Sequence, residues 1–400
     1  MEEKTVPVVF AANDNYAPYL GVTIYSLIKN ASPKREYRLY VLATDLNWHH
    51  RRRLLSMNRA NVQIEIVDVS KQMAQFSIPA VAHLSPETTY RLLIDRLFPQ
   101  YEKVLYLDCD LVVNRDVAEL YDTNLEGAVL GATIGMLREG VYRYIDKTLH
   151  LLPEQYFNAG VILINIPRFS KEGIGEKGLR MLSEQTYMTQ DQDVLNLLCA
   201  NSVKFIDKHW NIEWEQIVEE GKEIILDETH KGTLDYLDEP NIIHFTGPCK
   251  PWAHPENELS EYFWRYARET DFYEEILMKN MNSAGDTSDV FSMFLFPWEA
   301  VAPGSKIAIY GGGSVGRAFL RQVEKTEYCR AVAVCDKAPE KLKGLSCPVI
   351  SREELPGYDC DAVLIAVRGA ELADEIRSDC IAAGVPEDKL IWRDPVKKAR

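Results

Sequence analysis

Residues 103–113 read Lys-Val-Leu-Tyr-Leu-Asp-Cys-Asp-Leu-Val-Val, two aspartates between apolar runs. The run before Asp108 predicts a buried strand, and Asp108 and Asp110 follow it directly. Because side chains alternate along an extended chain, both carboxylates can point the same way at the strand's carboxyl end. Carboxylates among apolar residues are costly unless positive charge meets them. Mg²⁺ or Mn²⁺ is one such partner. A turn cap, or an ion pair with Arg115, is the alternative.

On both sides of this segment, β-rich runs alternate with helix-like stretches. We predict strands at residues 8–12, 38–42, 63–67 and 104–107, and helices at residues 18–30, 49–57 and 88–98. This alternation is typical of βαβ units and predicts an α/β fold with a mixed, mostly parallel sheet. In such sheets ligands bind at the carboxyl ends of the strands. Functional side chains are therefore expected directly after the apolar runs.

A second α/β unit is predicted after residue 303. Its strand at residues 306–310 is followed by a glycine-rich turn, a helix and strands at residues 331–335 and 362–367. Residues 255–280 have a helical pattern, and the polar stretch after them reads as a linker. The predicted parts are a first domain over residues 1–280, a linker over 281–302, and a small Rossmann-like accessory domain over 303–400.

Composition limits the classes of partner. The 400 residues carry a net charge of -15, which argues against nucleic acid, because phosphate binding needs a basic footprint. The eight cysteines include no Cys-x-x-Cys pair, so reduced thiols are favoured over disulfides or zinc. The N-terminus lacks the pattern of a signal peptide, and no apolar run is long enough for a membrane span. We expect a cytoplasmic protein, with peripheral contact to a membrane left open.

Six blocks, in one order between residues 6 and 255, resemble the family 8 glycosyltransferases. This family of retaining enzymes with a GT-A fold includes bacterial lipopolysaccharide galactosyltransferases and glycogenin. The blocks are Phe10–Tyr16, Thr89–Leu92, Lys103–Asp110, Tyr156–Gly160, Gln190–Asn196 and His244–Trp252. The resemblance implies a nucleotide-diphospho-sugar transferase fold for the first domain.

The resemblance also implies a metal site and a phosphate site. Asp108, Asp110 and His244 would hold Mn²⁺, or Mg²⁺, which binds the diphosphate of a UDP-sugar. Two carboxylates and an imidazole suit Mn²⁺ better than Mg²⁺, which prefers oxygen. Gly247 would let its backbone approach the phosphates, and Lys250 would meet them by direct charge. Without the resemblance, a lone histidine is more often structural, and this loop reads as a turn with a solvated lysine.

Other matched positions would contact the donor. Tyr16 would stack on uracil, with Asn13 and Asn15 bonding to base and ribose, although many relatives carry an acid where this chain has Asn13. Asp191 would bind sugar hydroxyls and Gln192 would lie near the anomeric carbon. The remaining implied donor contacts are Ala11, Arg91, Cys109, Asn158 and Ala159. Taken without the family, these residues read as helix starts, turns and surface positions.

The implied activity is metal-dependent, retaining transfer of a hexose, galactose or glucose, to a glycan or lipid-linked sugar acceptor. The implied catalytic group is Gln192, Asp191 and Lys250. Because no carboxylate is obviously placed as a covalent nucleophile, we favour attack on the front face, with the leaving phosphate as base. Cell-surface polysaccharide or lipopolysaccharide synthesis is the implied setting.

Two other classes stay open. The turn with Gly311, Gly313 and Gly316, followed by Asp336 at the end of the next strand, has the spacing of a dinucleotide site. It suggests an NAD-linked sugar-nucleotide oxidoreductase or epimerase, although too little chain follows for a substrate half. The other class is a non-catalytic sugar-nucleotide-binding protein. A smaller role for the glycine turn, as an accessory nucleotide site, is also compatible with the spacing.

Overall fold

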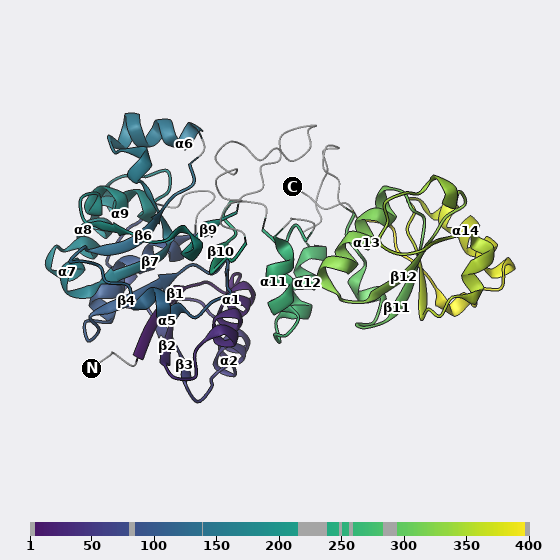
Figure 1. The fold of residues 1–400 in the computed structure, drawn as a ribbon, viewed down its shortest axis with the longest axis horizontal. Coiled ribbons are helices and arrows are strands. Elements are labelled where there is room, and N and C mark those ends of the chain that lie inside the picture. The colour runs from purple at the N-terminus through teal and green to yellow at the C-terminus, as the bar shows by residue number, and fades with distance from the viewer. Residues whose placement is uncertain are drawn as a thin grey trace. The chain divides into compact units, whose positions relative to one another are not determined.

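The computed structural model describes residues 5–79, 85–137, 139–214, 238–247, 250–255, 259–282 and 294–396. The described residues up to 247 form one compact unit, and those from 250 form a second (Figure 1). Among the described residues, no helix has the length and apolar character to cross a bilayer.

The first unit is built on a seven-stranded sheet in the order β3-β2-β1-β4-β7-β6-β8. Its strands are β1 Thr5–Ala11, β2 Glu36–Ala43, β3 Val62–Asp68, β4 Lys103–Leu107, β6 Leu130–Ile134, β7 Phe157–Asn165 and β8 Val203–Phe205. Strand β7 runs antiparallel to both neighbours, and the other pairs are parallel. This confirms the predicted mixed, mostly parallel sheet.

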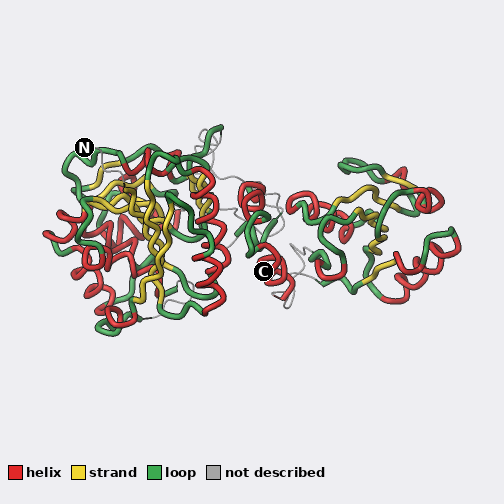
Figure 2. Tube along the Cα trace, turned by 90° about the horizontal axis from the view of Figure 1, so that it is seen from below, coloured by secondary structure: helices red, strands yellow, loops and turns green. Residues whose placement is uncertain are grey.

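Helices cover both faces of this sheet (Figure 2). The described helices of this unit are α1 Ala17–Asn30, α2 Trp48–Leu55, α3 Ser70–Met73, α4 Ile94–Leu97, α5 Val117–Tyr121, α6 Glu139–Tyr144, α7 Ile166–Lys171, α8 Ile174–Glu184 and α9 Asp191–Cys199. The helix predicted at residues 88–98 forms as a 3-10 helix, Pro86–Leu93, that continues into α4. Strands buried on both faces explain the continuous apolar runs of β1, β4 and β7.

A second, small sheet carries His244 and Glu213. It has the order β5-β10-β9, with β5 Leu111–Val113, β9 Ile212–Glu213 and β10 Ile242–His244. Strand β10 is antiparallel to β5, so His244 lies opposite Leu111, and it is parallel to β9, so His244 also pairs with Glu213. The turn between β4 and β5 holds Asp108 and Asp110. The small sheet therefore brings His244 to the end of β4.

The second unit contains a five-stranded parallel sheet in the order β13-β12-β11-β14-β15, which is the 3-2-1-4-5 order of doubly wound folds. Its strands are β11 Lys306–Tyr310, β12 Arg330–Cys335, β13 Val349–Ile350, β14 Ala362–Ile365 and β15 Leu390–Trp392. Its helices are α11 Ser260–Ala267, α12 Tyr273–Asn282, α13 Ser314–Thr326 and α14 Ala370–Ala382. The described part of the predicted accessory domain is thus a parallel sheet with helices, and its assignment as a Rossmann-like accessory domain stays a prediction.

Helices α11 and α12, which the sequence analysis placed in the first domain, belong to this second unit. The ring of Tyr273 lies 6.1 Å from that of Trp264 and 6.3 Å from that of Tyr328. The Tyr273 hydroxyl donates to the carbonyl of Thr326 at the end of α13, 3.0 Å away. The compact units thus divide between residues 247 and 250, not at 280. Within the predicted linker, residues 283–293 lie outside the described residues.

This packing predicts that residues 303–400 are more stable when α11 and α12 are attached. We expect a fragment of residues 250–400 to unfold at least about 4 °C above a fragment of residues 303–400, because about 1 kcal/mol shifts the midpoint of a domain this size by that much. Thermal unfolding followed by circular dichroism measures the difference. Equal midpoints would show that the aromatic contacts of Tyr273 add nothing to stability.

Candidate active site

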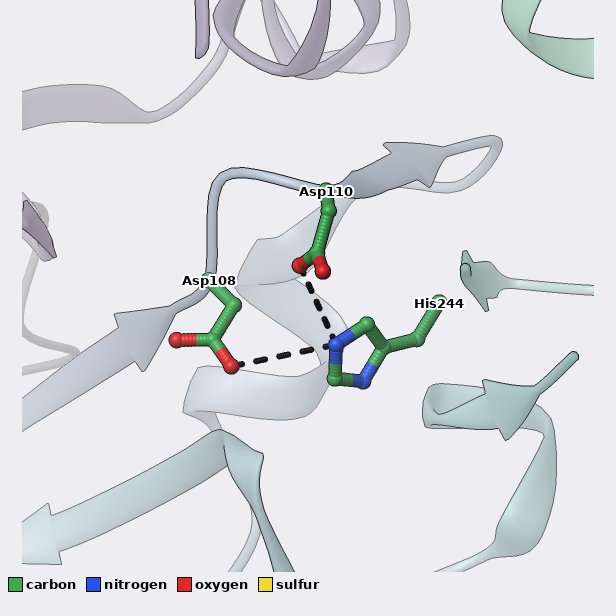
Figure 3. Close-up of side chains that lie close together, drawn as sticks. All are labelled: Asp108, Asp110 and His244. Carbon is green, nitrogen blue, oxygen red and sulfur yellow. Dashed lines mark ion pairs between the residues drawn. The ribbon is translucent and has the colours of Figure 1, made fainter. Parts of the chain in front are cut away.

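Asp108, Asp110 and His244 converge at the carboxyl ends of β4 and β10 (Figure 3). His244 Nε2 lies 3.2 Å from Asp110 Oδ1 and 3.7 Å from Asp108 Oδ2. One ligand atom from each residue lies within 4.8 Å of the others. The three residues that the family resemblance implies as metal ligands are therefore close enough to share one cation.

The Asp108 carboxylate is held so that one oxygen faces His244. Its Oδ1 accepts from Arg91 Nη2 at 2.8 Å and from the Tyr106 hydroxyl at 2.9 Å. Its Oδ2 is the oxygen on the side of His244. The carboxylate is thus oriented by protein donors before any ligand binds, as is usual for metal-ligating carboxylates.

The His244 ring is oriented from the opposite side. Its Nδ1 lies 3.0 Å from Asn211 Oδ1, and an amide oxygen can only accept. Nδ1 therefore carries a proton, and whenever the ring is neutral its lone pair is on Nε2, on the side of the two carboxylates. Burial lowers the pKa of His244, but the charges of Asp110 and Asp108 outweigh burial and raise the pKa above its ordinary value.

The donor set of this region fits a divalent cation. Arg91 is ion-paired with Asp108 and Asp191, Lys208 with Glu213, and Asp110 with His244. Two carboxylate oxygens and an imidazole nitrogen suit Mn²⁺ and similar ions.

Arg91 joins the cluster to the start of α9. It is 3% exposed, and its Nε lies 2.9 Å from Asp191 Oδ2, while Nη1 donates to the Ala159 carbonyl. Burial raises the pKa of Asp191 to about 6, although Arg91 acts in the opposite direction. The guanidinium thus holds two carboxylates in place. Its predicted contact with sugar or phosphate stays a prediction.

The predicted base-binding residues follow β1, next to β4 in the sheet. Burial raises the pKa of the Tyr16 hydroxyl, and the charges of Asp110, Cys109 and Asp108 raise it further. Asn13 Oδ1 accepts from the Tyr16 backbone N–H at 3.0 Å, and its Nδ2 donates to Glu87 at 3.1 Å.

The other predicted donor contacts near the end of β1 differ in their exposure to solvent. Asn15 is exposed, whereas Ala11 is buried at the end of β1. Cys109, between the two aspartates, is also buried, and its thiol donates to the Ala11 carbonyl at 2.9 Å. The Cys109 side chain thus ties β1 to the turn after β4. Its predicted donor contact stays a prediction.

The predicted sugar-pocket residues lie along the start of β7 and of α9. Gln192 Oε1 accepts from the Ala159 backbone N–H at 2.9 Å, and its Nε2 donates to the Tyr156 hydroxyl at 3.4 Å. Asn158 is buried and bonds Glu213 through Nδ2 at 3.0 Å. The structure thus brings Asn158, Ala159, Asp191 and Gln192 to the carboxyl end of β4, where Asp108 lies.

The phosphate loop is only partly described. Gly247 has a φ of 70°, in the left-handed region that glycine adopts without strain. Pro248 and Cys249 of the same block lie outside the described residues. Lys250 belongs to the second compact unit. The roles of Gly247 and Lys250 at the phosphates stay predictions.

The C-terminal glycine turn is closely packed. A Cβ on Gly316 would lie 1.8 Å from the Gly311 carbonyl oxygen, so this glycine allows α13 to approach the turn. Asp336 Oδ2 accepts from the Gly312 N–H at 2.8 Å, and Leu342 lies against Gly312. These contacts account for the motif as a structural turn. Nucleotide binding by Gly311, Gly313, Gly316 and Asp336 stays a prediction.

Sequence reasoning overlooked Gly160 and Asn211. A Cβ on Gly160 would lie 2.2 Å from His244 Cε1 and 2.7 Å from Asp108 Oδ2. Gly160 is the last residue of a block that matches the family, and this position could have singled it out from the sequence. Asn211 lies before β9 in a stretch without a motif, and only the alternation of polar and apolar residues from 210 to 213 marked it.

The mixed sheet with Asp-x-Asp at the end of β4 defines a GT-A glycosyltransferase. Two solved structures of the galactosyltransferase LgtC, one of an active-site mutant and one in complex with donor and acceptor sugar analogs, share this fold. They are 27% identical, cover 66% of this chain and 96% of LgtC, and have TM-scores of 0.53 and 0.50.

The chain belongs to glycosyl transferase family 8, whose family model matches residues 7–255. A putative glycosyltransferase of Haemophilus influenzae is 28% identical over 253 residues, which cover 62% of this chain and 73% of the relative. A lipopolysaccharide 1,3-galactosyltransferase of Salmonella typhimurium is 27% identical over 270 residues, or 64% of this chain and 76% of the relative. The protein is therefore a glycosyltransferase, as the sequence predicted.

Proposed function

We propose that this glycosyltransferase moves a hexose from a UDP-sugar to a glycan or lipid-linked sugar acceptor, with retention at the anomeric carbon and with a divalent metal. The observation that carries the proposal is the cluster of Asp108, Asp110 and His244, whose ligand atoms lie within 4.8 Å of one another. Such a cluster at the carboxyl ends of strands is suited to a cation that a diphosphate shares.

The bound cation would supply positive charge to the departing diphosphate. The residues of the chain would orient the donor around it. Tyr16, the residue before α1, would stack its ring on the uracil. Asp191, held by Arg91, would accept from sugar hydroxyls. Lys250, from the loop after β10, would add charge at the phosphates.

Retention is proposed to proceed by attack on the front face of the sugar. A double displacement needs a carboxylate nucleophile beside the anomeric carbon. Asp191 is ion-paired with Arg91, and Asp193 accepts from the hydroxyls of Tyr156 and Tyr144. Gln192, the implied neighbour of the anomeric carbon, is an amide and a poor nucleophile. The leaving phosphate would then take the proton of the acceptor hydroxyl.

The relatives guide the choice of sugar, acceptor and metal. The Salmonella relative is a lipopolysaccharide galactosyltransferase, and LgtC binds donor and acceptor sugar analogs. Galactose or glucose is therefore the proposed sugar, and a cell-surface polysaccharide or lipopolysaccharide is the proposed product, made at the cytoplasmic side. The imidazole of His244 favours Mn²⁺ over Mg²⁺. The oxidoreductase and epimerase alternatives rest only on the closely packed glycine turn.

Metal removal tests the proposal. The purified protein is screened with UDP-galactose and UDP-glucose for release of UDP, first with Mn²⁺, then after EDTA, then with Mn²⁺ restored. We expect turnover with one sugar that EDTA abolishes and Mn²⁺ restores. UDP with Mn²⁺ at about a hundredfold its Kd should also raise the free energy of unfolding by about 2.7 kcal/mol. Turnover that EDTA leaves unchanged would contradict the metal assignment.

A further inference from the structure

A row of buried polar side chains leads away from His244. Asn211 Oδ1 accepts from His244 Nδ1 at 3.0 Å, and Asn211 Nδ2 donates to Asn158 Oδ1 at 2.9 Å. Asn158 Nδ2 in turn donates to Glu213 Oε2 at 3.0 Å. All four residues are buried. Neither the family match nor the relatives assign a role to Asn211 or Glu213.

The last member of the row determines the direction of every bond in it. An ionised carboxylate only accepts, so Glu213 obliges Asn158 to present its NH₂ group. The oxygen of Asn158 must then face Asn211, and the Gly160 N–H also donates to that oxygen at 2.8 Å. Asn211 therefore presents its own NH₂ to Asn158 and its oxygen to His244. His244 Nδ1 has to be the protonated nitrogen.

Glu213 is itself well anchored. Its Oε1 accepts from Lys208 Nζ at 2.9 Å and from the Met136 backbone N–H at 3.1 Å. Both oxygens of this buried carboxylate thus accept hydrogen bonds, and one of the donors is a charged ammonium group. Lys208 and Met136, the donors at one end of the row, thus determine the direction of its hydrogen bonds as far as the imidazole of His244 at the other end.

We propose that Asn211 and Glu213 are positioning residues that hold His244 as the Nδ1–H tautomer, with Nε2 aimed at the cation site. The inference rests on the metal site of the proposed function. It gives Asn158 a role in this row, because its amide oxygen accepts from Asn211 and Gly160 and its NH₂ donates to Glu213. A histidine ligand oriented in this way binds metal better, and loss of such partners typically costs ten- to a hundredfold in affinity.

Glu213→Gln is the sharpest test, because it keeps the shape of the side chain and reverses its polarity. With Lys208 and Met136 still donating to Oε1, the new NH₂ group would face the NH₂ of Asn158, donor against donor. We expect the affinity for Mn²⁺, measured by calorimetry without nucleotide, to fall about tenfold. Asn211→Ala, which removes the acceptor of His244, should lower it ten- to a hundredfold.

The tautomer is a readout that a merely structural role would not change. In ¹⁵N-histidine-labelled, metal-free protein at about pH 9, where histidine is neutral, the ring nitrogens of His244 should report proton on Nδ1. The signal is assigned by comparison with His244→Ala. In Asn211→Ala the two tautomers should be mixed. Asn211→Asp, whose carboxylate still accepts from Nδ1 but sets an oxygen against Asn158 Oδ1, should restore the Nδ1–H tautomer.

Asn196→Ala is the matched control for the cavity that the loss of a buried asparagine side chain creates. Asn196 is also buried and bonds the backbone of Phe157 on the same strand, β7, as Asn158. It should lower stability without changing the tautomer or the Mn²⁺ affinity. If wild-type protein binds no Mn²⁺, the proposed function fails. If wild-type binds Mn²⁺ and Glu213→Gln and Asn211→Ala bind it equally well, the positioning role is wrong.

Discussion

Asp110→Asn is expected to lower metal-dependent turnover of the UDP-sugar by a hundred- to a thousandfold. The change removes a charge that faces His244 Nε2 at 3.2 Å and leaves the side-chain volume nearly unchanged. Losing one main electrostatic stabiliser of a transition state has a cost of that order. Release of UDP at saturating Mn²⁺ measures the effect. Asp110 is the better choice than Asp108, whose carboxylate also holds Arg91 and Tyr106.

A matched control uses another Asp-x-Asp pair of the chain. Asp361 accepts from the Lys306 backbone N–H at the start of β11, in the second compact unit. Asp361→Asn removes the same charge from the same local sequence pattern and should leave turnover unchanged. A folded Asp110→Asn protein with normal turnover would rule out Asp110 as a metal ligand.

Gly160→Ala is expected to weaken Mn²⁺ binding by at least about a hundredfold, an effect comparable with loss of a ligand. The added methyl group would lie 2.2 Å from His244 Cε1 and 2.7 Å from Asp108 Oδ2, far inside contact distance. Both ligands would have to move apart, and overpacked sites relax only at a cost. The Gly160 carbonyl also accepts from the Asp108 backbone N–H at 2.8 Å, so the strand cannot shift away freely.

Gly131→Ala separates this effect from the general cost of a methyl group in the sheet. Gly131 lies in β6 opposite Leu163 of β7, and its Cβ would lie 2.9 Å from Leu125 Cδ2, a side-chain atom that can move. This variant should lose some stability and keep its Mn²⁺ affinity. If Gly160→Ala binds Mn²⁺ as tightly as Gly131→Ala, the ligands do not lie where the structure places them.

The three proposed metal ligands were accessible to sequence reasoning for two different reasons. Asp108 and Asp110 directly follow an apolar strand, and the end of a strand is a local property of the chain. His244 also ends a short apolar run, but only its matched block singled it out from other histidines. The structure then placed it 3.2 Å from Asp110 through the pairing of β10 with β5.

The division into units was harder to predict. The helical pattern of residues 255–280 was recognised, and α11 and α12 form there. Their partner could not be predicted, because an amphipathic helix does not specify which apolar surface it covers. The contacts of Tyr273 with Thr326 and with the ring of Tyr328 decided it.

The sequence by itself determined the strand and helix alternation, the Asp-x-Asp turn after β4 and the membership in family 8, because periodicity and ordered motifs are written in neighbouring residues. The tertiary structure alone decided that Arg91 holds Asp108 and Asp191, that Gly160 leaves room for His244, and that Asn211 accepts a hydrogen bond from His244. These contacts join segments far apart in the chain. They depend on the register of paired strands, which brings side chains within hydrogen-bond distance only after the sheets have formed.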